Sequence, residues 1–469
     1  MRARVDSAIQ LDKRELSVRL LERLRAGLSF PNPVYTQRVR MGKHPGDALE
    51  RLFFYEENGT QLRLPRGAIQ LLREAAHEEG IVVRCEDERL FPAESLDLLC
   101  DVPLRDYQAA AVATLSKVTQ GHWIMPCGGG KTRSAIGAIA RLRTPSLILV
   151  HSIDLAEQWL DGVRDLLGLE AGLVGGGEEH VGPVTVAVIQ TLVRWAPERV
   201  DAFLRRFGLV ITDEAHHTPS ATFRAIVGRA PARYRLGLTA TPERPDGLGP
   251  LLEFFFGPAL VTVTHEQLIG AGVLRVPRIV ALETSFEFPY KDASDRPAML
   301  DALARDEARN RQIVETIAPD AASGHTSLVL SGFVWHCEAL ERALCGLGLR
   351  AQAMTSRVPR KKRKAMLEAA RTGELQVLIA TSLADEGLDL PRLARVMLAS
   401  PVRAEGRNNQ RLGRLMRPHP AVSEKVLYDV VDSRVPLLRK YYLERRQMYA
   451  AVLGTPAPEL ARQRSVIAA

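Results

Sequence analysis

The sequence predicts an α/β protein with two tandem parallel-sheet domains and a small N-terminal α/β module. From about residue 101 onward, short apolar runs rich in β-branched residues alternate with helical stretches, and they form two clusters, roughly 101–262 and 279–440. Continuous apolar strands separated by helices are typical of parallel sheets covered on both faces. Residues 1–100 have a different pattern, so we treat them as a separate module.

Length and composition are those of a multidomain globular protein. The 469 residues suffice for about three domains. No apolar run approaches the roughly 18 residues of a membrane span, and the N-terminus has no apolar signal-peptide core. We therefore expect a cytoplasmic protein without a membrane partner. None of the five cysteines has CxxC spacing, so neither a zinc site nor a disulfide framework is indicated.

The net charge of +8 is compatible with an anionic partner. The position of the charged residues along the chain is more informative than the total. Residues 1–100 hold sixteen basic and sixteen acidic side chains. The segment Arg357–Lys364 holds six basic residues and no acid, and Arg403–Arg446 holds eleven basic against five acidic. The positive excess is therefore concentrated in the second half of the chain.

Four segments are expected along the chain. The N-terminal module (1–100) combines a helix over Leu11–Leu28, a strand at Leu52–Tyr55, a turn at Asn58-Gly59 and a helix over Ala68–Glu78. The two sheet domains span 101–278 and 279–446, with a hinge at Val273–Ile279, and a flexible tail covers 447–469. The strands expected in the first domain are His122–Met125, Ser146–His151, Thr185–Ile189, Leu209–Thr212 and Arg235–Thr239. Those expected in the second are Thr326–Leu330, Val377–Ala380, Val396–Ala399 and Leu427–Val431.

A glycine-rich loop follows the first of these strands and opens a helix over Ser134–Leu142. Three consecutive glycines let the backbone N–H groups point at phosphate oxygens, and the helix adds its positive N-terminal end. Lys131 can then reach the β and γ phosphates, and the Thr132 hydroxyl can ligate Mg²⁺. The glycines are Gly128, Gly129 and Gly130. The strict phosphate-loop pattern has glycine at the position of Met125, so the sequence departs from it there.

Two carboxylates end an apolar strand about eighty residues later. Phosphoryl transfer requires one carboxylate to hold the metal ion and one to orient or deprotonate the attacking water. We expect Asp213 to take the first role and Glu214 the second. His216 and His217 follow, but Mg²⁺ prefers oxygen ligands. A further strand ends in Gly237–Pro242, whose hydroxyls could couple this acidic pair to a nucleic-acid strand.

Polar residues at helical spacing lie in the second domain. Gln410, Arg414 and Arg417 stand at i, i+4 and i+7, which places them on one face of a helix. A departing γ-phosphate needs an added positive charge, the arginine-finger role. We expect these side chains to complete a catalytic site, because one domain holds the phosphate loop and the other holds the arginines.

These pieces together resemble the superfamily 2 helicases, within the branch of XPB and the phage helicase UvsW. The resemblance covers about residues 101–445. In the first domain the matching motifs are Leu104–Gln108, Pro126–Thr132, Val150–Trp159, Gln190–Leu192, Asp213–Phe223 and Leu238–Pro242. In the second they are Leu328–Phe333, Ala380–Pro391 and Gln410–Arg417. The short interval between Pro242 and Phe256 leaves little room for the thumb-like insertion of XPB, which favours the UvsW-like branch.

The resemblance implies two RecA-like domains and ATP hydrolysis, with Mg²⁺, coupled to movement on nucleic acid. It implies that Arg105 and Gln108 recognise adenine, and that Gly387 and Asp389 contact or sense ATP. Thr191 and Thr381 would contact the nucleic-acid strand. The basic run suggests Arg357, Lys361 and Lys362 as further phosphate contacts; a merely solvated start of a helix over Ala365–Arg371 is an equal alternative.

The preferred function is an ATP-dependent DNA helicase or translocase that unwinds, anneals or branch-migrates DNA. One alternative is a nucleic-acid-binding or scaffold protein whose ATPase has decayed; the presence of Lys131, Glu214 and Arg414 speaks against it. A second makes RNA the substrate. A third is a motor subunit of a phage-defence or restriction complex, which would need a partner nuclease because no nuclease constellation is visible.

The N-terminal module is expected to recognise forked or branched DNA, unless it merely docks on the first domain. Arg38, Arg40 and Lys43 follow Tyr35 closely, and aromatic residues interleaved with basic ones suit unpaired strands. Arg63 and Arg66 stand beside a helix start at Gly67, where backbone N–H groups could meet a phosphate.

Overall fold

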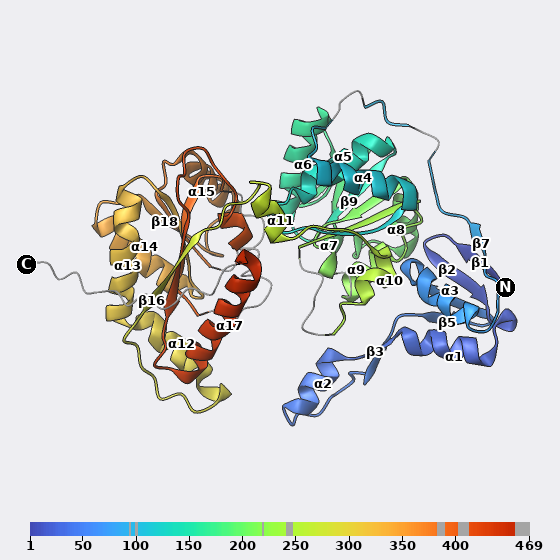
Figure 1. Ribbon diagram of the computed structural model, residues 1–469, viewed down its shortest axis with the longest axis horizontal. Coiled ribbons are helices and arrows are strands. Elements are labelled where there is room, and N and C mark those ends of the chain that lie inside the picture. The colour runs from blue at the N-terminus through green and yellow to red at the C-terminus, as the bar shows by residue number, and fades with distance from the viewer. Residues whose placement is uncertain are drawn as a thin grey trace, which may run out of the picture. The chain divides into compact units, whose positions relative to one another are not determined.

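The computed structural model describes residues 1–92, 95–98, 102–217, 220–240, 247–381, 390–401 and 412–454. By internal contacts the chain divides into two compact units (Figure 1). The first comprises residues 1–125 and 130–263, and the second comprises 126–129 and the chain from Thr264 onward. Both units contain a parallel sheet flanked by helices, so the predicted α/β class is confirmed.

The first unit begins with the N-terminal module, which contains a five-stranded sheet in the order β5-β6-β2-β1-β7 and a separate β3-β4 pair. Its strands are β1 (Arg2–Val5), β2 (Ala8–Asp12), β3 (Ser29–Pro31), β4 (Arg51–Phe53), β5 (Glu56–Asn58), β6 (Gln61–Pro65) and β7 (Arg84–Asp87). Its helices are η1 (Lys13–Glu15), α1 (Val18–Gly27), α2 (Pro33–Arg40), η2 (Arg66–Ala68) and α3 (Ile69–His77). The turn expected at Asn58-Gly59 joins β5 to β6, and Gly59 has the positive φ of 54° that such a turn requires.

The helix expected from Leu11 starts later, at Val18. Ser17 caps it, since its side chain accepts a hydrogen bond from the Leu20 N–H. Leu11 instead belongs to β2, where it pairs with Leu62 of β6 and is buried. The apolar residues of 11–28 thus belong to two elements, and helical spacing alone did not separate them.

The rest of the first unit, which we call lobe 1, is built on an eight-stranded sheet in the order β11-β10-β12-β9-β13-β14-β8-β15. Its strands are β8 (Gln120–Ile124), β9 (Ser146–Val150), β10 (Gly172–Gly175), β11 (Glu178–Glu179), β12 (Val184–Val188), β13 (Leu209–Thr212), β14 (Tyr234–Thr239) and β15 (Ala259–Thr262). All neighbours pair in parallel except β10 and β11. The carboxyl ends of the parallel strands therefore share one edge of the sheet.

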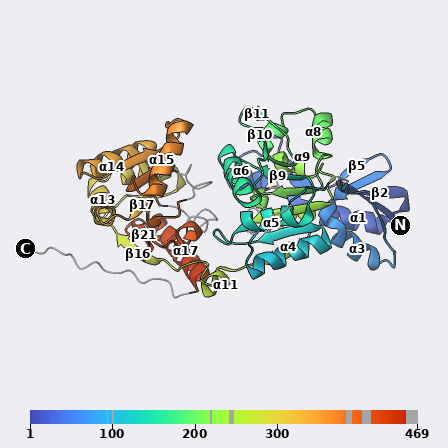
Figure 2. The same cartoon turned by 90° about the horizontal axis from the view of Figure 1, so that it is seen from above.

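Helices cover both faces of this sheet. Its helices are α4 (Asp106–Val118), α5 (Lys131–Leu142), α6 (Ile153–Leu167), α7 (Ile189–Leu192), α8 (Pro197–Leu204), η3 (Ala215–His217), α9 (Ala221–Val227) and α10 (Leu251–Phe256). Helices α4, α5 and α6 lie side by side (Figures 1 and 2). A single hydrophobic cluster packs α7 to α10 against strand residues such as Leu147, Leu149 and Val210.

The same hydrophobic cluster continues from lobe 1 into the N-terminal module. It contains module residues such as Ile9, Leu20 and Leu64 together with Phe255 and Phe256 of α10. Aromatic rings meet across the junction: the centroids of Phe54 and Phe255 lie 6.5 Å apart, and those of Phe30 and Phe254 lie 6.1 Å apart. The module and lobe 1 therefore share one core.

Two buried arginines fasten this junction. Arg66 donates to the Gln120 Oε1 and to the Ala232 carbonyl, both at 2.6 Å. Arg235 donates to the carbonyls of Ser7 at 3.0 Å and Ala230 at 2.6 Å. Burial lowers the pKa of both guanidinium groups, that of Arg235 to about 9. The expectation that Arg66 and the backbone at Gly67 meet a phosphate is therefore wrong, because lobe 1 occupies that side.

The second unit contains a six-stranded, wholly parallel sheet in the order β16-β21-β20-β17-β19-β18. Its strands are β16 (Arg278–Glu283), β17 (Thr326–Leu330), β18 (Ala351–Met354), β19 (Val377–Ala380), β20 (Leu393–Leu398) and β21 (Val426–Val431). Its helices include α11 (His265–Gly270), η4 (Ala293–Asp295), α12 (Arg296–Arg305), α13 (Glu307–Ala322), α14 (Val334–Gly346), α15 (Arg360–Thr372) and α17 (Pro436–Leu453). None of the helices in the described part of the chain combines the length and apolar character that crossing a lipid bilayer requires.

The structure differs from the expected segment limits in three places. The contact boundary between the units falls at Val263, ahead of the expected hinge at 273–279, and Arg278 and Ile279 already belong to β16. Helix α17 continues to Leu453, past residue 446, because the buried Tyr449 donates to the Asp429 carboxylate at 2.9 Å. Helix α15 begins at Arg360, so most of the basic run is helical.

Substituting Gly67→Ala should destabilise the first unit. A Cβ at this position would lie 2.0 Å from the Glu253 carbonyl oxygen and 2.7 Å from the Gly257 nitrogen, both backbone atoms. Overpacking of this kind costs about 1–3 kcal/mol, or roughly 2–10 °C in the midpoint of thermal unfolding for a unit of this size. Gly346→Ala is the matched control, since its Cβ would meet nothing within 4 Å. Equal midpoints for the two variants would show that the junction is looser than the structure indicates.

Candidate active site

A glycine loop follows β8 and ends where α5 begins at Lys131. Gly128 and Gly130 have φ of 87° and 81°, a region that side-chain-bearing residues rarely adopt. Gly130 is the N-cap of α5, so the first N–H groups of that helix are left without helical acceptors and lie next to the loop. This arrangement suits an anion, because the helix N-terminus carries partial positive charge.

Gln108 lies against the loop from α4. Its side chain is fully buried, and its Oε1 accepts a hydrogen bond of 2.9 Å from the Arg105 N–H. A Cβ on Gly130 would come within 2.3 Å of the Gln108 Nε2, so only glycine fits there. The structure therefore brings the motif around Gln108 and the glycine loop together within lobe 1.

Lys131 folds back over the loop. Its Nζ donates a hydrogen bond of 3.0 Å to the Met125 carbonyl, the last carbonyl before the loop. The neighbouring Thr132 is half-buried at the first turn of α5.

Asp213 follows β13 directly and both of its carboxylate oxygens are engaged. Its Oδ2 accepts a hydrogen bond of 2.9 Å from the Trp159 Nε1, and its Oδ1 accepts one of 2.9 Å from the Glu214 N–H. Only 7% of the residue is exposed. These two donors fix the plane of the carboxylate.

Glu214 has a φ of 46°, an uncommon conformation for a residue with a side chain and one that often marks a functional site. Its Oε2 lies 3.3 Å from the Nδ1 of His216, and the same nitrogen lies 3.2 Å from the Thr239 Oγ1. Thr239 is fully buried at the end of β14. A contiguous contact path thus runs from Glu214 through His216 to the strand beside it.

Strand register brings these groups to one edge of the sheet. Strand β14 lies between β13 and β8, with Thr212 opposite Gly237 and Thr239 opposite Ile124. The acidic pair and the glycine loop therefore stand one strand apart. Thr132 and Asp213 offer hydroxyl and carboxylate oxygens, the ligand types that Mg²⁺ prefers, so the donor set fits this ion. In the described ranges, His, Cys, Asp and Glu form no group of three that could hold a metal ion by themselves.

The predicted residues Arg414, Arg417 and Thr381 lie within the second unit. Arg414 and Arg417 are half-buried beside the buried Leu415 and Met416, and the Arg275 N–H donates to the Met416 carbonyl at 2.8 Å. Thr381 follows β19 and is 9% exposed. The predicted residues Gln410, Gly387 and Asp389 lie outside the described residues.

The predicted nucleic-acid contacts differ in their surroundings. Thr191 is half-buried in α7, directly after β12. Lys361 and Lys362 are exposed in the first turn of α15, which contains no acid. Arg357 is exposed and pairs with Glu338 at 3.4 Å, so its charge is partly offset.

The sequence did not predict a role for Trp159. It also did not predict that His216 contacts both Glu214 and Thr239. Trp159 is 1% exposed on α6. Its spacing on an amphipathic helix is that of an ordinary core residue. The available signal was chemical: a buried indole N–H needs an acceptor, and the acidic pair is one.

Comparisons with known proteins give a consistent result. The family described as the res subunit of type III restriction enzymes matches residues 101–244, and the one described as the helicase conserved C-terminal domain matches residues 308–419.

The DNA 3'-5' translocase XPB2 of Sulfurisphaera tokodaii is 28% identical over 331 residues, which cover 62% of this chain and 73% of that protein. The putative DNA 3'-5' helicase Rad25 of Halobacterium salinarum is 31% identical over 340 residues, covering 70% of this chain and 54% of that protein. The chain thus spans only about half the length of the halobacterial relative.

Among solved structures, S. cerevisiae Dbp5 bound to RNA and ADP BeF3 superposes with a TM-score of 0.54 at 15% identity. The match covers 72% of this chain and 87% of that structure. At this identity the likeness concerns the fold alone. It confirms the expected tandem RecA-like domains.

Trp159→Phe should weaken divalent-ion binding while leaving the fold intact, because it removes only the donor that orients Asp213. Loss of a donor behind a metal ligand typically costs about tenfold in metal affinity. Titration of Mn²⁺ in the presence of ADP, followed by the electron paramagnetic resonance of free Mn²⁺, measures this directly. Trp123→Phe is the matched control: Trp123 is equally buried, but its indole N–H meets no hydrogen-bond acceptor in the part of the chain that the structure describes. If both variants bind Mn²⁺ alike, the hydrogen bond to Asp213 has no role in metal binding.

Proposed function

The chain belongs to the superfamily 2 helicases of the XPB/UvsW-like branch, and we propose that it is an ATP-driven motor that moves on DNA and unwinds or remodels it. One observation carries the proposal. The glycine loop, Gln108 and the oriented pair Asp213-Glu214 lie at one edge of one sheet, as register and hydrogen bonds place them. These are the parts that phosphoryl transfer to water requires.

In the proposed ATP site, backbone N–H groups of Gly128, Gly129 and Gly130 cradle the phosphates and Lys131 neutralises their charge. Gln108 and Arg105 contact the adenine. Thr132 and Asp213 hold Mg²⁺, which when bound would offset charge on the phosphate oxygens. Glu214 accepts a proton from the attacking water.

The path from Glu214 through His216 to Thr239 supports a link between hydrolysis and the Gly237–Pro242 motif, which begins within β14. A change at Thr239 alters the hydrogen bonding available to His216, and with it the position of the Glu214 carboxylate. We propose that nucleic-acid binding changes the rate of ATP hydrolysis through this path. The second RecA-like domain would supply Arg414 and Arg417 for the developing charge on the γ-phosphate, with Gln410, Gly387 and Asp389 completing the nucleotide contacts.

DNA is the proposed substrate, because the similar XPB2 protein is a DNA 3'-5' translocase and the similar Rad25 protein is a putative DNA 3'-5' helicase. Thr191 and Thr381 would contact its backbone, and RNA remains the alternative partner. A second candidate function is a motor subunit of a restriction or defence complex with a partner nuclease. The match of residues 101–244 to the res-subunit family favours it.

The N-terminal module is proposed to bind branched or unpaired DNA through its β3-α2-β4 arm. Helix α2 has no buried residue, and Arg40 and Lys43 on the arm are exposed. Arg38 is exposed as well, and donates to the Pro45 carbonyl at 2.7 Å. The buried Arg66 takes no part in this proposal.

Substituting Lys131→Ala should remove most ATPase activity, whereas Glu214→Gln should bind ATP but turn over slowly, because only the second variant keeps the phosphate contact. Removing a catalytic base typically lowers turnover by about 10²–10⁴-fold. ATP binding is measured with a fluorescent analogue and turnover by phosphate release. Wild-type turnover in Glu214→Gln would contradict the assigned role.

The substrate is tested on the wild-type chain. Single-stranded DNA, forked DNA, a Holliday junction and RNA are compared as activators of phosphate release. We expect DNA to raise the rate well above its basal level. A rate indifferent to every nucleic acid would place the chain in another class of ATPase.

The double substitution Lys361→Gln/Lys362→Gln should weaken DNA binding and reduce its salt dependence. These lysines lie at the N-terminal end of α15, whose partial positive charge repels cations. A bound anion such as a phosphate would offset this repulsion. Each lost phosphate contact lowers the slope of log K against log salt by about 0.7–0.9. Anisotropy titrations at several salt concentrations measure both quantities. Unchanged affinity and slope would assign the run to solubility.

A further inference from the structure

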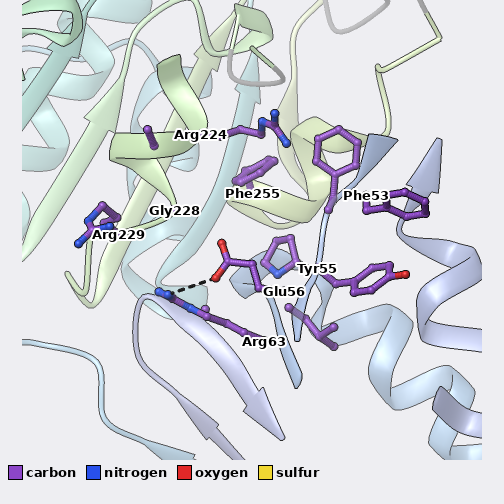
Figure 3. A pocket seen from close by; sticks show the side chains of 13 residues that line it. Phe53, Tyr55, Glu56, Arg63, Arg224, Gly228, Arg229 and Phe255 are labelled. Carbon is purple, nitrogen blue, oxygen red and sulfur yellow. Dashed lines mark ion pairs between the residues drawn. The ribbon is translucent and has the colours of Figure 1, made fainter. Parts of the chain in front are cut away.

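A pocket of about 260 Å³ lies in the first unit between the N-terminal module and lobe 1 (Figure 3). Phe53 and Tyr55 line it from the module, while Arg224 and Phe255 line it from α9 and α10 (Figure 3). The volume is somewhat below the roughly 300–1,000 Å³ of pockets that take whole drug-sized ligands. It therefore suits a single flat group of the size of a nucleobase.

The module side of the pocket offers an exposed aromatic surface. Phe53 is 49% exposed, although its neighbour Phe54 is buried, because successive side chains in an extended stretch point to opposite sides. The rings of Phe53 and Tyr55 lie 5.9 Å apart in an edge-to-face arrangement. Leaving a phenylalanine half in water costs hydrophobic free energy that a stacked ligand would recover.

The lobe side offers a cation without an anionic partner. The Arg224 guanidinium lies 4.8 Å from the centre of the Phe54 ring, and its Nε is buried with no hydrogen-bond acceptor. In the described ranges no carboxylate pairs with it. Burial lowers the pKa of this group.

The other charged residues of the pocket are already paired. Arg229 forms an ion pair of 2.6 Å with Asp201, and Arg63 lies 3.6 Å from Glu56. The dashed line in Figure 3 marks the second pair. The lining thus contains three arginines and a single acid, Glu56, so its charge attracts an anion. Because Arg63 and Arg229 already pair with carboxylates, Arg224 is the arginine expected to bind that anion.

We propose that this pocket binds one nucleotide of an unpaired nucleic-acid strand, with its base stacked on Phe53 and its phosphate on Arg224. Base stacking on aromatic side chains together with arginine contacts is how proteins hold single strands without regard to sequence. An acidic peptide would satisfy Arg224 but would leave the Phe53 surface in water, so the observations favour the nucleotide. The inference rests on the proposed motor function and adds a strand contact outside the motifs.

The test uses the full-length chain, with labelled oligo-dT as the probe in anisotropy titrations. Phe53→Ala should weaken binding about tenfold and leave the salt slope unchanged, since it removes stacking and no charge. Arg224→Gln should weaken binding and also lower the slope by about 0.7. On an oligonucleotide of abasic sites, Phe53→Ala should bind like wild type, because there is no base to stack.

Arg164→Gln is the matched control. It removes the same charge from lobe 1, at an exposed position of α6 paired with Glu170 and away from the pocket lining. Its oligo-dT affinity should stay within about twofold of wild type. Thermal unfolding of each variant, and ATPase at saturating DNA, should match wild type, because none of these residues belongs to the proposed ATP site.

Three outcomes would overturn the inference. The first is wild-type oligo-dT binding by Phe53→Ala and Arg224→Gln. The second is an equal loss for Phe53→Ala on normal and abasic oligonucleotides. The third is loss of poly-glutamate binding by Arg224→Gln with oligo-dT binding intact, which would make the pocket a docking site for an acidic protein segment. In each case DNA-stimulated ATPase of the wild-type chain still reports separately on the proposed motor.

Discussion

The site depends on the parallel register of three neighbouring strands in lobe 1. Because β14 lies between β13 and β8, the carboxylate after one outer strand and the glycine loop after the other are held at a fixed separation. Their carboxyl ends share an edge only because all three run in the same direction. Thr239, at the end of the middle strand, contacts His216 next to the acidic pair, and Thr239 pairs with Ile124, the last strand residue before the loop. The sheet thus brings the acidic pair and the start of α5 to one edge of lobe 1.

The N-terminal module and lobe 1 form one compact unit, and buried charge contributes to the junction between them. Arg66 donates to the Gln120 side chain and the Ala232 carbonyl of lobe 1, and Arg235 donates to the Ser7 carbonyl of the module. A buried guanidinium that loses such acceptors is costly, so the junction is favoured to stay closed. The pocket with Phe53 and Arg224 lies at this junction, so its walls come from both the module and lobe 1.

The second domain uses buried ion pairs to attach its outer helices. Arg309 of α13 pairs with Asp432 at 2.9 Å, and Arg445 of α17 pairs with Asp429 at 2.7 Å, all four side chains being nearly inaccessible. Both acids belong to β21 or directly follow it. Such pairs specify a position more than they add stability, because desolvation offsets much of their attraction. They fix where α13 and α17 lie against the sheet that carries Thr381.

The sequence by itself determined the fold class and the limits of β13, β17 and β19. It also predicted the roles proposed for Lys131, Thr132, Asp213 and Glu214. These features are local: apolar runs, glycine spacing and adjacent carboxylates reflect interactions within a few residues. Only the tertiary structure decided that Leu11 joins a strand, that Arg66 is buried, and that Trp159 orients Asp213. Each of these depends on partners 50 or more positions away, as the separation of 54 residues between Trp159 and Asp213 illustrates. Local spacing cannot predict such partners. Burial and hydrogen bonding at those positions depend on chain segments that come together only when the sheets assemble.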